Sequence, residues 1–432
     1  MYNFDSLTLQ YFFDENKDFI KNSVVQKIQL PSRHEIILNI RNIKEAKNKK
    51  LYININPKYP HICFASEDTL KKRDIEIPKQ PPMFCMQLRK YLNGSKIKDF
   101  KIVKYERILE IYFDYFDEIG SLTELCLALE FMGKHSNIIL YNSKSKTITG
   151  SIHNISQDKS SVREIYGGIK YIYPPLKQKE NVLNTSYSTF YEIAKDKDIK
   201  EISNNFYYLN QALVEKIFEN YSNIEESFNF IQKLVNGEQK EFLINFWNGK
   251  NSVNEALDNY FSNIMFDEIL YNKKQKLKKI LSNDIKKLEK ILKNKPQDNK
   301  ANLNKLKADY IMCNLYNLSQ GQKEFIFEDI KIDLDENLTP QENAQKYYSQ
   351  YKKEKTAFEY NISRYNRAKE KQEYFESIIF NIENAPDFET LNGIFEEISE
   401  LNSATKPKEK HIQKIEKTEF KGFEIYIGKN NK

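Results

Sequence analysis

A ladder of apolar residues in the second half of the chain restricts its fold more than any other feature. The spacing within this ladder is 4, 4, 3 and 4 residues, which is typical of a coiled-coil seam. A long helix with such a seam is stable only when another helix covers it. Residues 342–383 carry aromatic and aliphatic residues at helical spacing and supply that partner, so we predict an antiparallel two-helix arm. The ladder consists of Leu277, Leu281, Ile285, Leu288 and Leu292.

The other faces of the first arm helix are rich in lysine. Residues 271–295 contain ten lysines against Asp284 and Glu289, a local charge of +8 (10 minus 2), whereas the whole chain carries only +6. A basic stripe on a long arm fits contact with the phosphate backbone of RNA. It also fits a solvated coiled-coil exterior, which is the more usual explanation of such a stripe, so both interpretations stay open. The candidate contact residues on this stripe are Lys278, Lys279, Lys286 and Lys287.

The residues before the arm alternate short β-type runs with amphipathic segments. We predict helices over 4–20, 83–92 and 121–132. We predict strands over 35–41, 51–55, 61–64, 101–105, 107–113, 137–141 and 147–152.

These elements predict an α+β protein with several parts. A mixed α/β head occupies 1–175, and a small helical domain follows at 189–262 after a polar linker. The arm covers 263–402, with a structured tip at about 297–341 that contains a hairpin-like run at 325–334. A further helix is expected over 386–402 and a charged linker over 406–417.

Known catalytic and metal-binding patterns are missing from the sequence. The five histidines have no HxxxH or CxxC partners, and no GxxxxGK[ST], GxGxxG or GxSxG run occurs. We therefore expect no metal, no cofactor and no enzymatic activity. The four cysteines are far apart, and Cys63, Cys85 and Cys126 lie in apolar runs typical of buried reduced thiols.

The localisation expected from the sequence is cytoplasmic. The first residues lack the basic and apolar regions of a signal peptide. No run of about 18 apolar residues occurs, so we expect no membrane partner.

Three polar segments in the head combine backbone access with charge. Glu106-Arg107 opens a predicted strand, Gly133-Lys134-His135 lies at a predicted helix-to-strand junction, and Ser160 to Arg163 follows another strand. Glycine and serine let the backbone approach a phosphate, and the cations attract it. These segments are candidates for nucleic-acid contact. Stabilising turns with ordinary surface charges are the alternative.

At these segments the sequence resembles the NFACT family of ribosome quality control factors, which includes bacterial RqcH and fibronectin-binding protein A-like proteins. The resemblance covers nearly the whole chain. It rests on six ordered motifs: PPMFCMQLRKYLNG (81–94), KYERILEIYF (104–113), ELCLALEFMGKHSNIILYN (124–142), SSVREIYGGIKYIYPP (160–175), ADYIMCNLYNLSQGQ (308–322) and IDLDENLTPQENAQKYYSQYKKEKTA (332–357).

The resemblance implies a function and its partners. Family members bind large ribosomal subunits obstructed by peptidyl-tRNA and recruit tRNA, alanyl-tRNA in bacteria, for mRNA-independent tailing of the stalled chain. The ribosome performs the peptide-bond chemistry. The lysine-rich arm would then meet the large subunit, and neither DNA nor a membrane is an expected partner.

The resemblance also implies tRNA-binding residues. The family's acidic residue in the first helix matches Asp5, and its Asp-Arg pair matches Glu106-Arg107, with glutamate replacing aspartate. Lys134, His135 and Arg163 are added from their positions in the motifs.

Two further regions of the chain resemble known domains. The head and helical domain resemble formamidopyrimidine-DNA glycosylases with a helix-hairpin-helix, but the usual glycine is missing from Phe206-Tyr207-Tyr208-Leu209. Residues 418–432 resemble the start of the family's C-terminal RNA-binding domain, and we expect the strand at 423–432 to be unpaired.

Two other functions compete with this one. A fibronectin-binding surface adhesin is the main alternative, and the missing signal peptide argues against it. A DNA-lesion enzyme is the second. The Pro-Glu nucleophile pair that such enzymes carry at the N-terminus is missing from this sequence, which argues against it.

Overall fold

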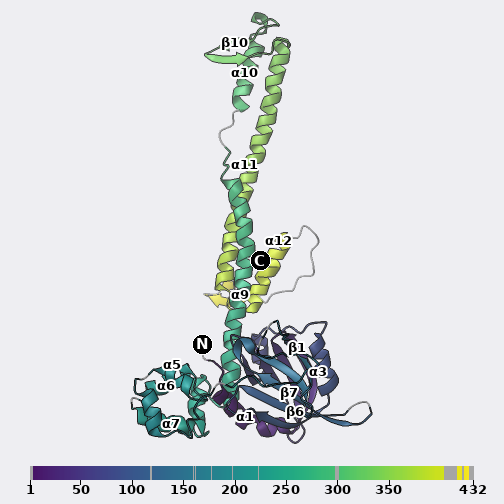
Figure 1. Cartoon of the computed structure of the whole chain (residues 1–432). Helices are drawn as coiled ribbons and strands as arrows, with labels where there is room; N and C mark the ends of the chain where they lie inside the picture. Colours follow the sequence, from purple (N-terminus) through teal and green to yellow (C-terminus); the bar gives the residue numbers. More distant parts are fainter. Residues whose placement is uncertain are drawn as a thin grey trace. The chain divides into compact units, whose positions relative to one another are not determined.

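The computed structural model describes residues 3–116, 119–158, 160, 162–176, 178–196, 198–221, 223–296, 301–402, 416–420 and 423–427. The chain divides into two compact units, Met1–Ile269 and Leu270–Lys432. The mixed α/β head and the long helices confirm the predicted fold class (Figure 1). The finer domain limits at 175, 189 and 262 stay predictions.

One antiparallel sheet forms the centre of the first unit. In the described part of the chain its order is β4-β3-β2-β1-β5-β6-β7-β8-β9. Strands β1 to β4 and strands β5 to β9 each pair in sequence order, and β1 joins the two groups by pairing with β5. Most connections are hairpins, and the segment between β4 and β5 carries two helices. The strands are β1 Ser23–Ser32, β2 Glu35–Asn42, β3 Lys47–Asn54, β4 His61–Ala65, β5 Lys96–Ile102, β6 Ile108–Phe116, β7 Leu122–Glu130, β8 Asn137–Asn142 and β9 Ile148–Ser151.

Three helices accompany the sheet: α1 (Ser6–Lys21), α2 (Glu67–Lys72) and α3 (Met83–Leu92). α1 and α3 bury leucine and phenylalanine side chains against the sheet in one continuous core. The predicted helices over 4–20 and 83–92 are thereby confirmed.

The predicted helix over 121–132 is wrong, because these residues form strand β7. β7 pairs with β6 on one side and β8 on the other. Both of its faces are covered: Leu125 and Leu127 enter the main core, while Cys126 and Ala128 enter a second core. A strand buried on both faces loses the alternation that identifies strands in a sequence. Strand β1 was also missed.

Cys63, Cys85 and Cys126 are buried free thiols, as predicted, and Cys313 is exposed. No disulfide therefore joins these four residues. Within the described ranges, no cluster of three or more His, Cys, Asp or Glu side chains is placed to hold a metal ion. None of the described helices has the length and hydropathy needed to cross a membrane.

Five short helices follow the head: α4 (Tyr187–Ala194), α5 (Ile199–Asn205), α6 (Gln211–Asn220), α7 (Ile224–Val235) and α8 (Lys240–Phe246). Their apolar side chains belong to the same core as the sheet and α1. The buried Trp247 donates its indole N–H to Thr8 Oγ1 at 3.2 Å. The helical segment and the head therefore fold as one unit.

Helix α9 (Val253–Leu292) begins in the first unit and ends in the second. Its predicted seam is buried at Leu277 and Leu281 and partly buried from Ile285 to Leu292. Leu277 and Leu281 pack against Phe375 and Ile378 of α11 (Pro340–Asn384). Helix α12 (Phe388–Asn402) adds Leu391, Ile394 and Ile398 to this core. The base of the arm is thus a three-helix packing rather than the predicted pair.

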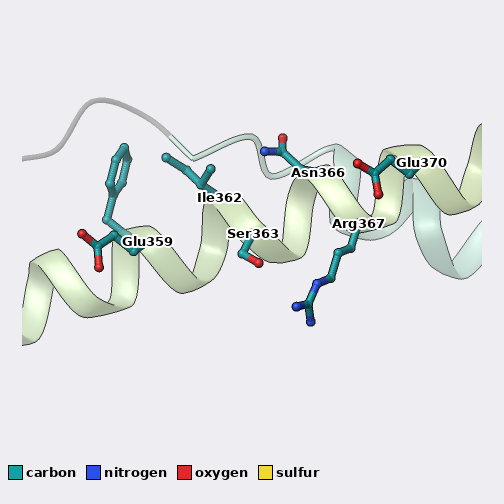
Figure 2. A pocket seen from close by; sticks show the side chains of 7 residues that line it. Glu359, Ile362, Ser363, Asn366, Arg367 and Glu370 are labelled. Atoms are coloured by element: carbon teal, nitrogen blue, oxygen red, sulfur yellow. The ribbon is translucent and has the colours of Figure 1, made fainter.

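The far part of the arm has a small core of its own. Helix α10 (Ala301–Cys313), the hairpin β10 (Glu324–Phe327) and β11 (Ile330–Asp333), and the start of α11 meet at Ile311, Ile332 and Ala344. A Thr339–Glu342 capping box begins α11, where the sequence predicted a start. Between the two cores, Phe358, Ile362 and Arg367 line a shallow hollow of about 590 Å³ on α11 (Figure 2).

The last strands correct one expectation. Strand β13 (Phe423–Ile427) pairs antiparallel with β12 (Glu416–Phe420), so it is not an unpaired strand. Its partner begins inside the segment that was predicted to be a charged linker. The rest of that linker lies outside the described residues.

Burial of His61 makes the stability of the first unit dependent on pH. The ring stacks on Phe261 at 4.0 Å, and Nδ1–H donates to the Tyr59 carbonyl at 2.8 Å. Burial, and then the charge of Arg73, lower the pKa of His61 to about 3. The folded protein keeps this ring neutral, whereas the unfolded chain takes up a proton below about pH 6.5.

We therefore expect the free energy of unfolding to fall as the pH drops from 6.5 towards 3, by up to about 1.4 kcal/mol per pH unit from this group. Urea titrations at several pH values measure this slope. His61→Phe should reduce it, whereas His135→Gln, at an exposed histidine, should not. An unchanged slope in His61→Phe would contradict the assignment.

Candidate nucleic-acid interface

Asp5 lies at the junction between the head and the helical segment. One carboxylate oxygen accepts from the Thr8 N–H at 2.7 Å and caps the start of α1. The other oxygen accepts from the side-chain amide of Asn210. Burial raises the pKa of Asp5, while the Thr8 and Asn210 hydrogen bonds and the charge of Arg107 lower it. Each oxygen of the carboxylate therefore accepts a hydrogen bond from the protein.

Arg107 lies beside Asp5, at the entrance to β6. Its guanidinium donates to the Phe4 carbonyl at 3.2 Å. Burial lowers the pKa of Arg107, and the charges of Asp5 and Glu106 oppose this shift. Burial raises the pKa of the half-buried Glu106, against the charges of Arg107 and Lys179. The structure thus brings the predicted residue Asp5 close to the predicted pair Glu106-Arg107, although about 100 positions separate Asp5 from that pair in the sequence.

An aromatic pair connects this loop to the turn between α5 and α6. Tyr105 has a left-handed backbone, φ 67°, and its ring stacks on Tyr207 with 4.3 Å between centroids and 11° between planes. Tyr208 also has positive φ, 70°, and meets Tyr105 edge-on at 5.7 Å. At Tyr208 the turn therefore adopts the left-handed backbone conformation that favours glycine, although the residue is tyrosine. Ring contacts compensate for part of the strain.

Lys134 and His135 are exposed on the one-turn helix Gly133–His135. A backbone hydrogen bond connects the segment before this helix to Arg107: the Phe131 N–H donates to the Arg107 carbonyl at 2.9 Å. The Phe131 ring also meets Phe4 edge-on at 5.4 Å. The side chains of Lys134 and His135 are therefore accessible to a ligand, and Lys134 carries a positive charge. Their contact with tRNA stays a prediction.

Arg163 has a different environment from the other predicted residues. Its guanidinium donates to both oxygens of the buried Glu130, and also to the Ile172 carbonyl at 2.9 Å. Glu130 additionally accepts from the Tyr171 hydroxyl at 2.8 Å. The Arg163 side chain is only 10% exposed. This geometry favours the structural interpretation that the sequence left open, in which Arg163 fastens the segment after β9 to the sheet.

The four candidate contact lysines of the arm divide into two pairs. Lys278 bonds to Glu383 at 2.5 Å and Lys287 bonds to Asp284 at 2.8 Å. Lys279 and Lys286 are exposed on α9. The second pair is therefore the better candidate for phosphate contact.

Sequence reasoning missed Asn210, Tyr207 and Lys179. Asn210 carries a readable signal, since asparagine before an amphipathic run is a typical N-cap. Its oxygen accepts from the Leu213 N–H at 2.8 Å. Nothing in the sequence indicates that its amide reaches Asp5, because 205 positions separate the two residues.

Comparison with known proteins gives one consistent result. The pattern of the NFACT N-terminal and middle domains matches residues 5–227 and 195–417. The chain is 27% identical over 492 residues to the Rqc2 homolog RqcH of Bacillus subtilis (strain 168), covering 100% of this chain and 82% of that protein. It is 27% identical over 458 residues to the Rqc2 homolog RqcH of Streptococcus pneumoniae serotype 2, covering 99% of this chain and 81% of that protein.

A solved structure of the N-terminal part of the fibronectin/fibrinogen-binding protein from Streptococcus suis is 29% identical, with a TM-score of 0.46, and covers 54% of this chain and 85% of that one. The two matched ranges of the family pattern together span residues 5–417, which is most of the chain. This protein therefore belongs to the family defined by the NFACT N-terminal and middle domains.

Proposed function

We propose that this protein is a ribosome quality control factor that binds obstructed large ribosomal subunits and recruits tRNA, alanyl-tRNA in particular, for mRNA-independent C-terminal tailing of stalled chains. Similarity to the Rqc2 homologs named RqcH along nearly the full length supports this role. In this proposal the ribosome performs the peptide-bond chemistry, and the protein positions tRNA.

The observation that carries the proposal is the grouping of Asp5, Glu106 and Arg107 at one junction. The Phe4 carbonyl accepts from the Arg107 guanidinium, and the charges of the two carboxylates favour its protonated form. A guanidinium fixed in this way offers planar, charge-assisted hydrogen bonds to phosphate or to a base edge. The exposed Lys134 adds charge that attracts the RNA backbone, and His135 is exposed beside it.

The arm supplies the ribosome contact in this proposal. Lys279 and Lys286 are exposed on α9, and contacts between lysine and rRNA phosphates release counterions. Binding to the subunit should therefore weaken as the salt concentration rises. Each lost phosphate contact should reduce the slope of log affinity against log salt by about 1.

We expect the protein to co-sediment with purified large subunits at low salt and to dissociate at high salt. Lys279→Gln combined with Lys286→Gln should reduce the salt slope by about 2, and more than Lys278→Gln combined with Lys287→Gln. Lys17→Gln, at an exposed lysine of the first unit, is the control.

Two results would count against this assignment. Wild-type protein that large subunits fail to retain at low salt would refute the proposed function. An unchanged salt slope in the Lys279 and Lys286 double variant would remove these lysines from the interface. Retention on immobilised fibronectin, without retention on subunits, would support the adhesin alternative.

A further inference from the structure

The Asp5–Asn210 pair joins two helix starts through a single amide group. Asp5 caps α1 with one oxygen, and Asn210 caps α6 with its own side-chain oxygen. The remaining atoms of the two side chains face each other, and the Asn210 amide donates to Asp5. A carboxylate only accepts, so this is the one amide orientation that satisfies both residues. Only 7% of Asp5 is exposed.

Arg107 depends on the position of this pair. It donates to the carbonyl of Phe4, the residue directly before Asp5. Any shift of the start of α1 therefore moves the acceptor of the guanidinium. The charges of Asp5 and Arg107 also stabilise each other within the same buried site.

Other contacts connect the same two segments. Tyr105 stacks on Tyr207, and its hydroxyl accepts from the Asn181 amide at 3.3 Å. Lys179 donates to the carbonyls of Ser203 and Phe206 at 2.7 and 3.4 Å. The turn between α5 and α6 is thus fixed against the loop that carries Glu106 and Arg107.

We propose that Asn210 is a positioning residue of the tRNA site, which holds Asp5 and through it aims the Arg107 guanidinium. The Asp5 carboxylate acts through these protein contacts and not by touching RNA. The helical segment thereby becomes part of the tRNA site. This inference rests on the proposed function.

Exchange of the two side chains separates positioning from direct contact. Asp5→Asn sets two amide donors against each other, and Asn210→Asp sets two carboxylates against each other. The double variant, Asp5→Asn with Asn210→Asp, restores one donor and one acceptor. Both caps survive in every variant, because asparagine and aspartate are equally good N-caps.

The experiment measures tRNA affinity by filter binding, melting temperature, and retention on large subunits. We expect each single variant to bind tRNA at least about tenfold more weakly, with subunit retention unchanged. We expect the double variant to bind within about threefold of wild type. Asn223→Asp, the same change at the N-cap of α7, should leave tRNA affinity unchanged.

The other possible results also test whether Asn210 positions the tRNA site. A double variant that regains the wild-type melting temperature but not tRNA binding would show that the carboxylate at position 5 touches RNA, which overturns the inference. If exchanged variants do not fold, Asn210→Ser keeps the cap and removes the amide donor. Wild-type tRNA affinity in that variant overturns the inference, and a tenfold loss supports it. Wild-type protein that binds no tRNA would instead refute the proposed function itself, and with it this inference.

Discussion

Replacement of Asp258 by alanine is expected to lower the free energy of unfolding by about 3–5 kcal/mol, because it leaves a buried arginine without its anion. Arg73 and Asp258 are only 1% and 4% exposed, and Arg73 Nη1 lies 2.8 Å from Asp258 Oδ1. The second nitrogen, Nη2, donates to the Asp258 backbone carbonyl at 3.1 Å. The guanidinium also lies over the Tyr52 ring at 4.6 Å.

Asp258 fastens the first part of α9 to the head within the first unit. Its Oδ2 accepts from the Ser66 N–H at 3.0 Å and from the Thr69 hydroxyl at 2.7 Å. Both donors lie at the start of α2. The substitution therefore removes an ion pair and takes the Asp258 acceptor from the Ser66 N–H, whereas the Thr69 hydroxyl keeps the Ser66 carbonyl as an acceptor at 3.0 Å.

Urea denaturation of the full chain measures this loss. Asp14→Ala, which breaks the exposed Lys17–Asp14 pair, should cost less than about 1 kcal/mol and serves as the matched control. Arg73→Met combined with Asp258→Leu should recover much of the loss, since an apolar pair of similar volume can replace a buried ion pair. A cost below about 1 kcal/mol for Asp258→Ala would contradict the expectation.

The second large effect is expected at Arg107. Arg107→Ala should reduce tRNA affinity by at least about tenfold, and up to about a hundredfold, because it removes the fixed guanidinium from the proposed contact site. It also leaves the Phe4 carbonyl without its donor and Asp5 without a neighbouring cation. Retention on large subunits should persist, because the proposal assigns that contact to the arm.

Filter binding with purified tRNA measures the effect, alongside the melting temperature. Arg41→Ala is the matched control, since Arg41 is an exposed arginine on β2. Arg107→Lys should stay defective, because lysine keeps the charge and loses the planar fork of donors. Equal tRNA recovery with wild type and folded Arg107→Ala would remove the Glu106-Arg107 pair from the tRNA site.

The sequence predicted best the elements whose signals are local. The apolar ladder from Leu277 to Leu292 identified α9, and Thr339-Pro340 identified the start of α11. The bounds of α3 were predicted as Met83–Leu92 and observed as such. In these elements the helical period and the capping residues lie within a few positions of each other.

The sequence failed where burial on two sides removes the period. Leu125 to Leu129 face two cores in turn, so β7 has the composition and unbroken apolar run of a buried helix. The third helix at the base of the arm, α12, was predicted as an element, but its packing against α9 and α11 was not. The local sequence pattern of a helix does not indicate which other segments it packs against.

The sequence by itself determined the α+β class, the long arm helices and the family resemblance. Only the tertiary structure decided that Asp5 reaches Asn210 and Arg107, that Arg73 meets Asp258, and that Arg163 is occupied by Glu130. The physical reason is that a buried charge must find its partner wherever the fold brings one. That partner can stand 205 positions away, as Asn210 does from Asp5, and no local spacing encodes it.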